Sequence, residues 1–445
     1  MLNNVMPDVK INTIMSKLKG YFQKPSGKVF LFILLAIFFN LRYAYPSESL
    51  FLNSLIDEAL KNNPQIQAAK QRYKAAQARV RLLRTLEDPK FEYEYDTIIS
   101  NMMGSEMNRK ISPMRTIAIS QTLLFPTKFF LRKNAAQKEA NAYEQEYKET
   151  ENKVVKDLKE SYFQLFLNDK KISLTQENLD LLSQFIEIVN KKLSVNKASQ
   201  QDSLKAQVEH SKLSNQLVLL EQEKKIAQSM LNSLLNRPSD AQIDSVEESS
   251  NKVLELDEQS LLKSTKESRP ELRSFQEMVR KSEIDYSLAK QEYLPDFMIK
   301  YKRDVSDGST GSWAGMIGVT VPLWFWEKQD SFVKEAHANV SVVKAEYQAQ
   351  ENMVLFEVRS SYARFDAAKK LVQIYETGVL PQAQAALETA RRGYETDTLS
   401  FLDLLDSERT LREFQMDYFE SLANLEIALA DLERAVGVDL SEVKK

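Results

Sequence analysis

Residues 89–99 read PKFEYEYDTII, and from Phe91 to Asp96 the apolar and acidic side chains alternate at every position. A period of two predicts a β-strand with one apolar face and one charged face. Residues 114–125 alternate again after a turn region around residues 104–113. We therefore predict a hairpin of two strands of roughly ten residues each, which is the length of a transmembrane β-strand.

The hairpin occurs twice in the chain. Residues 295–304 read PDFMIKYKRD and alternate in the same way, and residues 313–321 alternate after a glycine-containing turn. Pro295 stands 206 residues after Pro89, and Pro270 stands 206 residues after Pro64. Further residues recur at a spacing of 200, namely Leu123, Phe125, Lys128, Tyr147, Glu151, Asn152, Ser161 and Tyr162. The chain is therefore two copies of one large unit, and this repeat decides the architecture.

The rest of each copy predicts long helices. Residues 127–195 contain no Pro or Gly, so they predict a rod on the order of 100 Å at ~1.5 Å per residue. Residues 328–394 match this rod, although Gly378 and Pro381 are positioned to bend it. Each rod ends in a break, at Asn196 and at Asp397, because these residue types tolerate left-handed backbone. Further helices are predicted in three other stretches, residues 50–87, 201–235 and 401–436.

The N-terminus predicts export. Four lysines, at 17, 19, 24 and 28, precede the apolar run VFLFILLAIFF at residues 29–39. Eleven apolar residues are too few to cross a membrane and fit the core of a signal peptide. We expect cleavage near Ala44 and a mature chain that begins near residues 45–49.

Composition excludes several function classes. The chain has 445 residues, a net charge of −3, 10 Gly, 12 Pro and no Cys. A charge near zero gives no basic field for nucleic acid, and the absence of Cys excludes disulfides, thiolate metal sites and lipid attachment through an N-terminal Cys. The sequence shows no phosphate-binding loop, metal cluster or nucleophile–base set, so we predict neither an enzyme nor a cofactor.

The predicted sheet requires several chains. A lipid-facing sheet cannot leave an edge unpaired, and four strands are too few to close a barrel around a lumen. Three chains would pool twelve strands, and their helical hairpins would continue the barrel as a tube. The alternative is a secreted coiled-coil scaffold, which explains the rods but leaves the alternating strands unexplained.

Together these features resemble the TolC family of outer-membrane efflux channels, over about residues 50–438. The strand-exit stretches SQTLLF (120–125) and TVPLWF (320–325) correspond to a family motif. The resemblance implies a mainly α fold with a small β part: a trimer with a 12-stranded barrel in the outer membrane and a 12-helix periplasmic α-barrel. It also implies outer-membrane lipid, a periplasmic adaptor and an inner-membrane pump, of the RND type, as partners. Type I protein secretion is the competing role.

The resemblance also implies site residues. The helical tips, Val195, Asn196 and Lys197 in the first copy and Thr396, Asp397 and Thr398 in the second, would dock the adaptor. Tyr394 matches a gating tyrosine, whereas Leu399 stands where the family has a gating arginine. The aperture would be lined by Asp403 and Asp406, whose spacing puts both on one helix face; rings of Asp select cations. Phe125, Trp324, Phe325 and Trp326 would form a membrane aromatic girdle.

These observations divide the chain into five segments. Residues 1–46 form the leader, and residues 47–238 form the first copy, with its hairpin at 89–125 and its tip near 196. Residues 239–257 form an equatorial linker. The second copy covers residues 258–438, with its hairpin at 295–325 and its tip near 397, and residues 439–445 form a tail.

Overall fold

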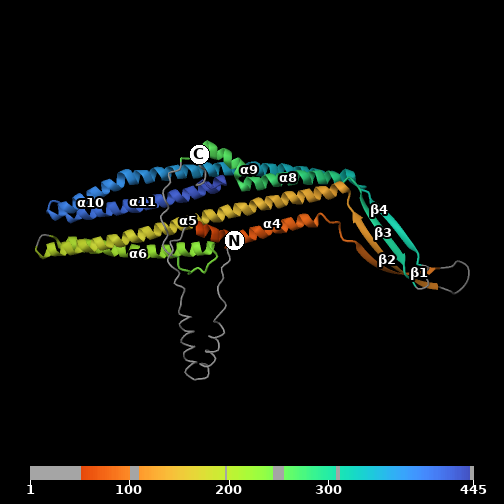
Figure 1. Ribbon diagram of the computed structural model, residues 1–445, viewed down its shortest axis with the longest axis horizontal. Coiled ribbons are helices and arrows are strands. Elements are labelled where there is room, and N and C mark those ends of the chain that lie inside the picture. The colour runs from red at the N-terminus through yellow and green to blue at the C-terminus, as the bar shows by residue number, and fades with distance from the viewer. Residues whose placement is uncertain (1–51, 101–109, 196–197, 244–254, 307–310, 441–445) are drawn as a thin grey trace, which may run out of the picture. The chain divides into compact units, whose positions relative to one another are not determined.

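The structure is a computed structural model that describes residues 52–100, 110–195, 198–243, 255–306 and 311–440. The predicted leader 1–46, the tip residues Asn196 and Lys197, most of the linker and most of the tail lie outside these residues. The described part has a small sheet at one end, long helices and two helical tips at the other end (Figure 1).

The sheet consists of four antiparallel strands in the order β1-β2-β3-β4. They are β1 (Lys90–Ser100), β2 (Lys110–Leu123), β3 (Asp296–Asp304) and β4 (Trp313–Thr320). The two hairpins join where β2 pairs with β3, with Ile119 opposite Tyr301 and Ser120 opposite Lys300. Strands therefore form where the sequence alternates, and β1 and β4 are the free edges of the sheet.

The two faces of the sheet differ as the alternation predicts. One face exposes large apolar side chains on all four strands: Phe91, Tyr93, Tyr95, Ile119, Ile299, Tyr301, Trp313, Ile317 and Val319. On the other face Lys300 pairs with Glu92, and Lys302 pairs with Glu94 at 3.3 Å. The hydrophobic core clusters of the described residues contain no strand residue. The apolar face is thus bare in a single chain, as a lipid-facing surface is.

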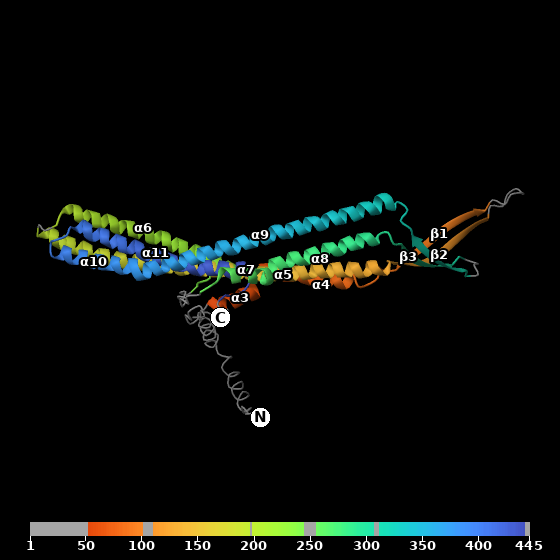
Figure 2. The same ribbon diagram turned by 90° about the horizontal axis from the view of Figure 1, so that it is seen from above.

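The longest helix is α5 (Pro126–Ser194), whose 69 residues run the length of both helical sections (Figures 1 and 2). Pro126 starts it, because proline fits the first helical turn, where its missing N–H costs nothing. Toward the tips α5 packs beside α6 (Gln200–Leu234) and α11 (Phe401–Val436). Toward the sheet it packs beside α4 (Pro64–Leu82) and α8 (Pro270–Gln291).

The second rod is interrupted. It consists of α9 (Asp330–Ile374), the π-helical turn η2 (Tyr375–Val379) and α10 (Leu380–Glu395). Pro381 lacks the N–H that an α-helix needs there, and the π turn accommodates this loss together with Gly378. A second π turn, η1 (Phe325–Gln329), joins the strand end to α9.

The helix predicted for residues 50–87 is in fact two helices, α3 (Leu52–Asn62) and α4. Asn63 separates them because its side chain caps α4, accepting hydrogen bonds from the backbone N–H groups of Gln65 (2.8 Å) and Ile66 (3.3 Å). Its amide also donates to the Leu234 carbonyl at 2.9 Å. The break therefore ties the start of the first copy to the end of its second long helix.

A buried arginine joins the two copies at the middle of the molecule. Arg269, the residue between α7 (Glu258–Ser268) and α8, is fully buried. Its guanidinium lies 3.2 Å from Glu149 of α5 and 3.2 Å from Glu357 of α9. Gly437 caps α11 with φ of 84°, and a Cβ there would lie 3.0 Å from the Arg269 Cα. Glycine is needed at this position for both its backbone and its close approach.

Candidate functional site

The second tip closes as a Schellman turn. Asp397 has φ of 59°, the left-handed conformation that glycine usually supplies. The N–H of Thr398 donates to the Gly393 carbonyl at 2.8 Å, and the N–H of Asp397 donates to the Tyr394 carbonyl at 3.3 Å. The Thr398 hydroxyl also donates to the Gly393 carbonyl. The predicted break at Asp397 is confirmed, and aspartate replaces glycine there without loss of the turn.

A lysine from the first copy holds this turn. Lys192, near the end of α5, places its Nζ 2.6 Å from the Asp397 carboxylate and 2.6 Å from the Tyr394 carbonyl. The same ammonium lies 4.2 Å from the centre of the Tyr394 ring, a cation–π contact. We call this set of contacts the tip latch. It crosses from one copy to the other, and sequence reasoning did not find it.

Tyr394 is buried in the tip. Its ring packs against Phe401 with centroids 5.7 Å apart, and its hydroxyl has no hydrogen-bond partner among the described residues. Burial, reinforced by the charges of Asp202 and Asp397, raises the pKa of Tyr394. A buried hydroxyl without a partner costs free energy.

Leu399 packs against Gly393. A Cβ on Gly393 would lie 2.6 Å from the Leu399 Cδ1 atom, too close for any real pair of atoms. Glycine at 393 is therefore required by this contact. The residue of the first copy that is equivalent to Gly393 is Lys192, at the spacing of 201 that also relates Asp202 to Asp403.

Asp403 has a structural role that the sequence analysis did not assign to it. Ser400 caps α11, and its N–H and hydroxyl donate to the Asp403 carboxylate at 3.0 and 2.7 Å. These hydrogen bonds lower the pKa of Asp403. This is a capping box, in which two backbone donors at the helix start are satisfied. Asp406 is exposed one turn further along α11 and takes no part in it.

The first tip repeats the capping box of the second tip. Ser199 and Asp202 form the same capping box at the start of α6. Lys205 stands where the second copy has Asp406, and Val195 is exposed at the end of α5. The expected adaptor-docking residues Asn196 and Lys197 lie outside the described residues. Thr396, Asp397 and Thr398 of the second tip are all exposed.

A buried cluster of charged residues lies between α6 and α11. Glu209 of α6 meets Arg409 and Arg412 of α11, the latter at 3.2 Å, and Arg412 also pairs with Glu408 at 2.9 Å. Burial works to raise the pKa of Glu209, but the two arginines outweigh it and the pKa is lowered. Burial raises the pKa of Glu408. The capping boxes of α6 and α11 are 201 residues apart, so Glu209 and Arg409, at a spacing of 200, are not equivalent repeat positions, and the repeat gave no signal for this cluster.

The four predicted girdle residues follow the ends of β2 and β4 in the chain. Trp324, Phe325 and Trp326 are half or more exposed, at 64%, 50% and 63%. Phe125 is half-buried and stacks on Phe297, with ring centroids 6.5 Å apart. Phe125 therefore differs from the other three, because it is largely engaged within the chain.

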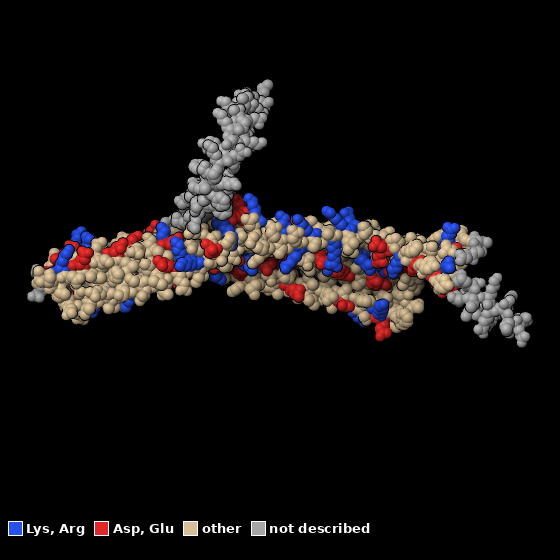
Figure 3. All heavy atoms as spheres, turned by 90° about the horizontal axis from the view of Figure 1, so that it is seen from below, with Lys and Arg blue, Asp and Glu red and all other residues tan. Residues whose placement is uncertain are grey.

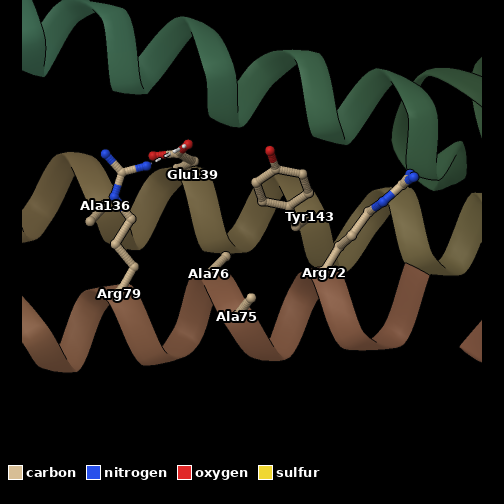
Figure 4. A pocket seen from close by; sticks show the side chains of 7 residues that line it. All are labelled: Arg72, Ala75, Ala76, Arg79, Ala136, Glu139 and Tyr143. Carbon is tan, nitrogen blue, oxygen red and sulfur yellow. Dashed lines mark hydrogen bonds and ion pairs between the residues drawn. The ribbon is translucent and has the colours of Figure 1, made fainter. Parts of the chain in front are cut away.

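A further surface feature of the described residues is a small cavity between two helices. A cavity of about 260 Å³ lies between α4 and α5, where alanines let the helices approach and Arg79 pairs with Glu139 at 3.4 Å (Figure 4). The charged residues that line it are those of a solvated helix surface. Within the described residues no acidic or histidine group forms a metal site, and no helix has the length and apolar character needed to cross a bilayer.

Comparison with known proteins gives three results. A family model described as "Outer membrane efflux protein" matches residues 55–237 and 261–438. The cobalt-zinc-cadmium resistance protein CzcC of Cupriavidus metallidurans is 20% identical over 280 residues, which are 62% of this chain and 66% of that protein, just under two thirds. The solved outer-membrane channel OprN superposes with a TM-score of 0.77 at 17% identity, over 87% of this chain and 89% of OprN.

Two further solved structures share the fold. CusC, whose structures are described in terms of folding and transmembrane channel formation, gives a TM-score of 0.77 at 17% identity over 90% of this chain and 96% of its own. The open-state MtrE outer membrane channel of Neisseria gonorrhoeae gives 0.74 at 17% identity, over 87% and 89%. The family match covers most of the chain in two stretches, and the chain therefore belongs to the outer membrane efflux protein family.

Proposed function

We propose that this protein is the outer-membrane exit duct of a tripartite efflux system and that three copies build one channel. The observation that supports this most directly is the sheet, which has one bare apolar face, one charged face and two free edges. Such a sheet is stable in a bilayer only when its edges are paired in a closed barrel. The charged face then lines a water-filled lumen, and the helices extend that lumen through the periplasm.

The helical section supports the same assembly. Exposed apolar residues follow one side of α6 (Leu204, Val208, Leu219, Ile226 and Met230) and one side of α9 (Val342, Met353, Phe356, Leu371 and Ile374). Figure 3 shows a broad uncharged surface at the tip end of the molecule. Both helices are at the margins of the helical layer, so neighbouring copies would cover these stripes.

We propose that the second tip is the gate. The tip latch holds the second hairpin against the first, and the π turn at residues 375–379 gives the second rod a place to bend. Opening then requires Lys192 to leave Asp397 and the Tyr394 carbonyl. Asp403 and Asp406 from three copies would surround the aperture and favour cations. Asp406, which has no capping role, would contribute the more freely available charge.

The tips at residues 195–197 and 396–398 are proposed to receive a periplasmic adaptor, and an inner-membrane pump of the RND type would supply the energy. Trp324, Phe325 and Trp326 would lie at the membrane boundary. The CzcC relative is named for cobalt, zinc and cadmium resistance, which favours metal or other small-molecule efflux over the second candidate, type I protein secretion. No step in this role needs a cofactor.

The experiment is to extract the protein from the outer-membrane fraction in mild detergent. We expect a heat-sensitive trimer on gels, ion-conducting channels in planar bilayers, and capture of the adaptor in a pull-down. A soluble elongated coiled coil that forms no channel would contradict the proposal. Capture of a secreted protein substrate in place of an RND pump complex would favour the second candidate.

A further inference from the structure

The junction between the two copies inside one chain is fixed by a buried lysine. Lys128, in the first turn of α5, is 1% exposed. Its Nζ donates to the Leu294 carbonyl at 2.9 Å and to the Asp296 carboxylate at 3.2 Å. Asp296 also accepts from the Phe125 N–H at 3.0 Å, beside the Phe125–Phe297 stack. This anchor holds the end of β2 on the start of β3.

The repeat equivalent of this lysine has no anchor. Lys328 corresponds to Lys128 at the spacing of 200, and it follows β4 as Lys128 follows β2. Lys328 and its neighbour Glu327 are both exposed, and neither forms a salt bridge within the described residues. β4 is a free edge, so within one described sheet no strand lies beside it to receive this lysine.

The equivalent receiving segment lies at the opposite edge of the sheet. β3 corresponds to β1 at the spacing of 206, so residues 294–297 correspond to residues 88–91. This segment contains Asp88 and Lys90, both exposed and without a salt bridge to the described residues. Glu87 and Asp88 also border an apolar groove of about 540 Å³ between the end of α4 and the start of α5. A ready acceptor therefore lies beside the free edge of β1.

Residues 327–328 and residues 88–90 carry complementary charges, although the acids are not at the position that Asp296 occupies in the repeat. Within the chain Lys128 meets Asp296, and the counterpart of Asp296 is the cation Lys90. Asp88 is the counterpart of Leu294, whose carbonyl accepts from Lys128, so the Asp88 carboxylate is beside the position that Lys328 would reach. Glu327, the counterpart of Thr127, adds an anion next to Lys328 that can meet Lys90. Two pairs of opposite charges can therefore form between the two segments. Two such pairs make this contact more specific than a single charge pair would.

We propose that Glu327 and Lys328 of one copy dock on Lys90 and Asp88 of the next copy, forming an interprotomer clasp at the base of the barrel. The Lys328 ammonium donates to the Asp88 carboxylate, and the Glu327 carboxylate accepts from Lys90. Phe325 stacks near Phe91, as Phe125 does on Phe297. The clasp rests on the proposed multi-chain duct and names the residues that close it.

The same repeat also fixes a strand register that is consistent with the clasp. Transferring the β2–β3 register to β4 and the next copy's β1 places Val319 opposite Tyr95 and Thr320 opposite Glu94. Both apolar residues then lie on the lipid-facing side and both polar residues on the lumen side. A register shifted by one residue would exchange the faces. The duplication therefore predicts a junction between chains that keeps one apolar face and one polar face around the whole closed barrel.

The absence of Cys allows a direct test by disulfide formation. We would oxidise the purified D88C/K328C protein and examine it on denaturing, non-reducing gels. β1 and β4 lie three strand spacings apart in one chain, about 14 Å, whereas a disulfide needs Cα atoms within about 7 Å. We therefore expect no intrachain bond, and covalent species of two and three chains that disappear on reduction.

The D88C/K334C pair is the matched control, because residue 334 is exposed and lies one and a half turns further along α9; we expect at least a tenfold lower yield. Charge reversal provides a second measurement: K328E should lower the temperature at which the oligomer dissociates, and D88K/K328E should restore it. An intact trimer that gives no specific D88C/K328C bond overturns the clasp and leaves the duct standing. A protein that stays monomeric overturns both.

Discussion

The two copies of the repeat use similar sequences to build different devices. In the first copy α5 is unbroken over 69 residues and ends in a lysine that reaches across the molecule. In the second copy the rod is divided by a π turn, and its tip is the side that receives this lysine. π turns inside helices occur often at functional sites. We propose on this basis that the first copy is the rigid strut and the second copy the moving arm of the gate.

The largest loss of stability is expected when the buried charge cluster that joins α6 to α11 is broken. Arg412→Ala leaves Glu209 and Glu408 buried with less compensation, and Arg412 is the salt-bridge partner of Glu408. Breaking a buried pair costs about 3–5 kcal/mol. We expect a clear fall in the thermal unfolding midpoint, measured by circular dichroism in detergent.

The matched control is Arg364→Ala. Arg364 is exposed and its bridge to Asp431 is long, at 3.7 Å, so the cost should stay within about 1 kcal/mol. Equal losses for the two variants would contradict the assignment of the cluster as the tie between the copies.

The same cluster predicts a pH dependence. The pKa of Glu209 is lowered in the folded chain, so its contribution to stability is present above its unfolded value of 4.5 and is lost as pH falls through the folded value. We expect the stability advantage of the wild type over Glu209→Gln to shrink between pH 5 and about 3. Thermal midpoints of both proteins across this range test it. An advantage that grows on acidification would show the opposite sign and sink the interpretation.

The capping boxes allow structure and selectivity to be separated. Asp202→Ala and Asp403→Ala each remove the reciprocal bond of a capping box and should cost about 1 kcal/mol. Only Asp403→Ala and Asp406→Ala should lower cation selectivity, and Asp406→Ala should leave stability unchanged. Reversal potentials in planar bilayers measure the selectivity. If Asp202→Ala changes selectivity as much as Asp406→Ala, the second tip has no special role.

The smallest effect concerns the bend of the second rod. A Cβ at Gly378 meets nothing within 4 Å, so Gly378→Ala should stabilise the arm by about 0.5–1 kcal/mol. A stiffer arm should also open less often in single-channel recordings. Gly393→Ala is the contrasting variant, because its Cβ collides with Leu399 and should destabilise the tip. If wild-type and Gly378→Ala channels are open for equal fractions of time, the π turn has no role in gating.

Much of the fold could be predicted because it depends on local periodicity. The alternation from Phe91 to Asp96 decides β1, and the lack of Pro and Gly decides α5. The break at Asn63 was missed, because a side-chain cap that reaches the Leu234 carbonyl depends on a contact 171 residues away. The interruption of the second rod was predictable from Gly378 and Pro381, but its π geometry was not.

The site was less predictable for the same reason. The turn at Asp397 follows from the residue type, whereas the tip latch depends on Lys192 arriving from another helix. The i, i+3 spacing of Asp403 and Asp406 suggested equivalent roles, yet Ser400 engages only Asp403. Position within the helix start separates the two carboxylates, and their spacing alone cannot.

The tip latch can be tested most directly by fixing it. In the Cys-free chain, Lys192→Cys/Asp397→Cys can be joined by a short, cleavable thiol reagent, with completeness checked by mass spectrometry. We predict that joined channels in planar bilayers stay at their lowest conductance and recover when the bridge is cleaved. Joined channels that open as freely as cleaved ones would contradict the claim that the second tip must leave Lys192 for the duct to open.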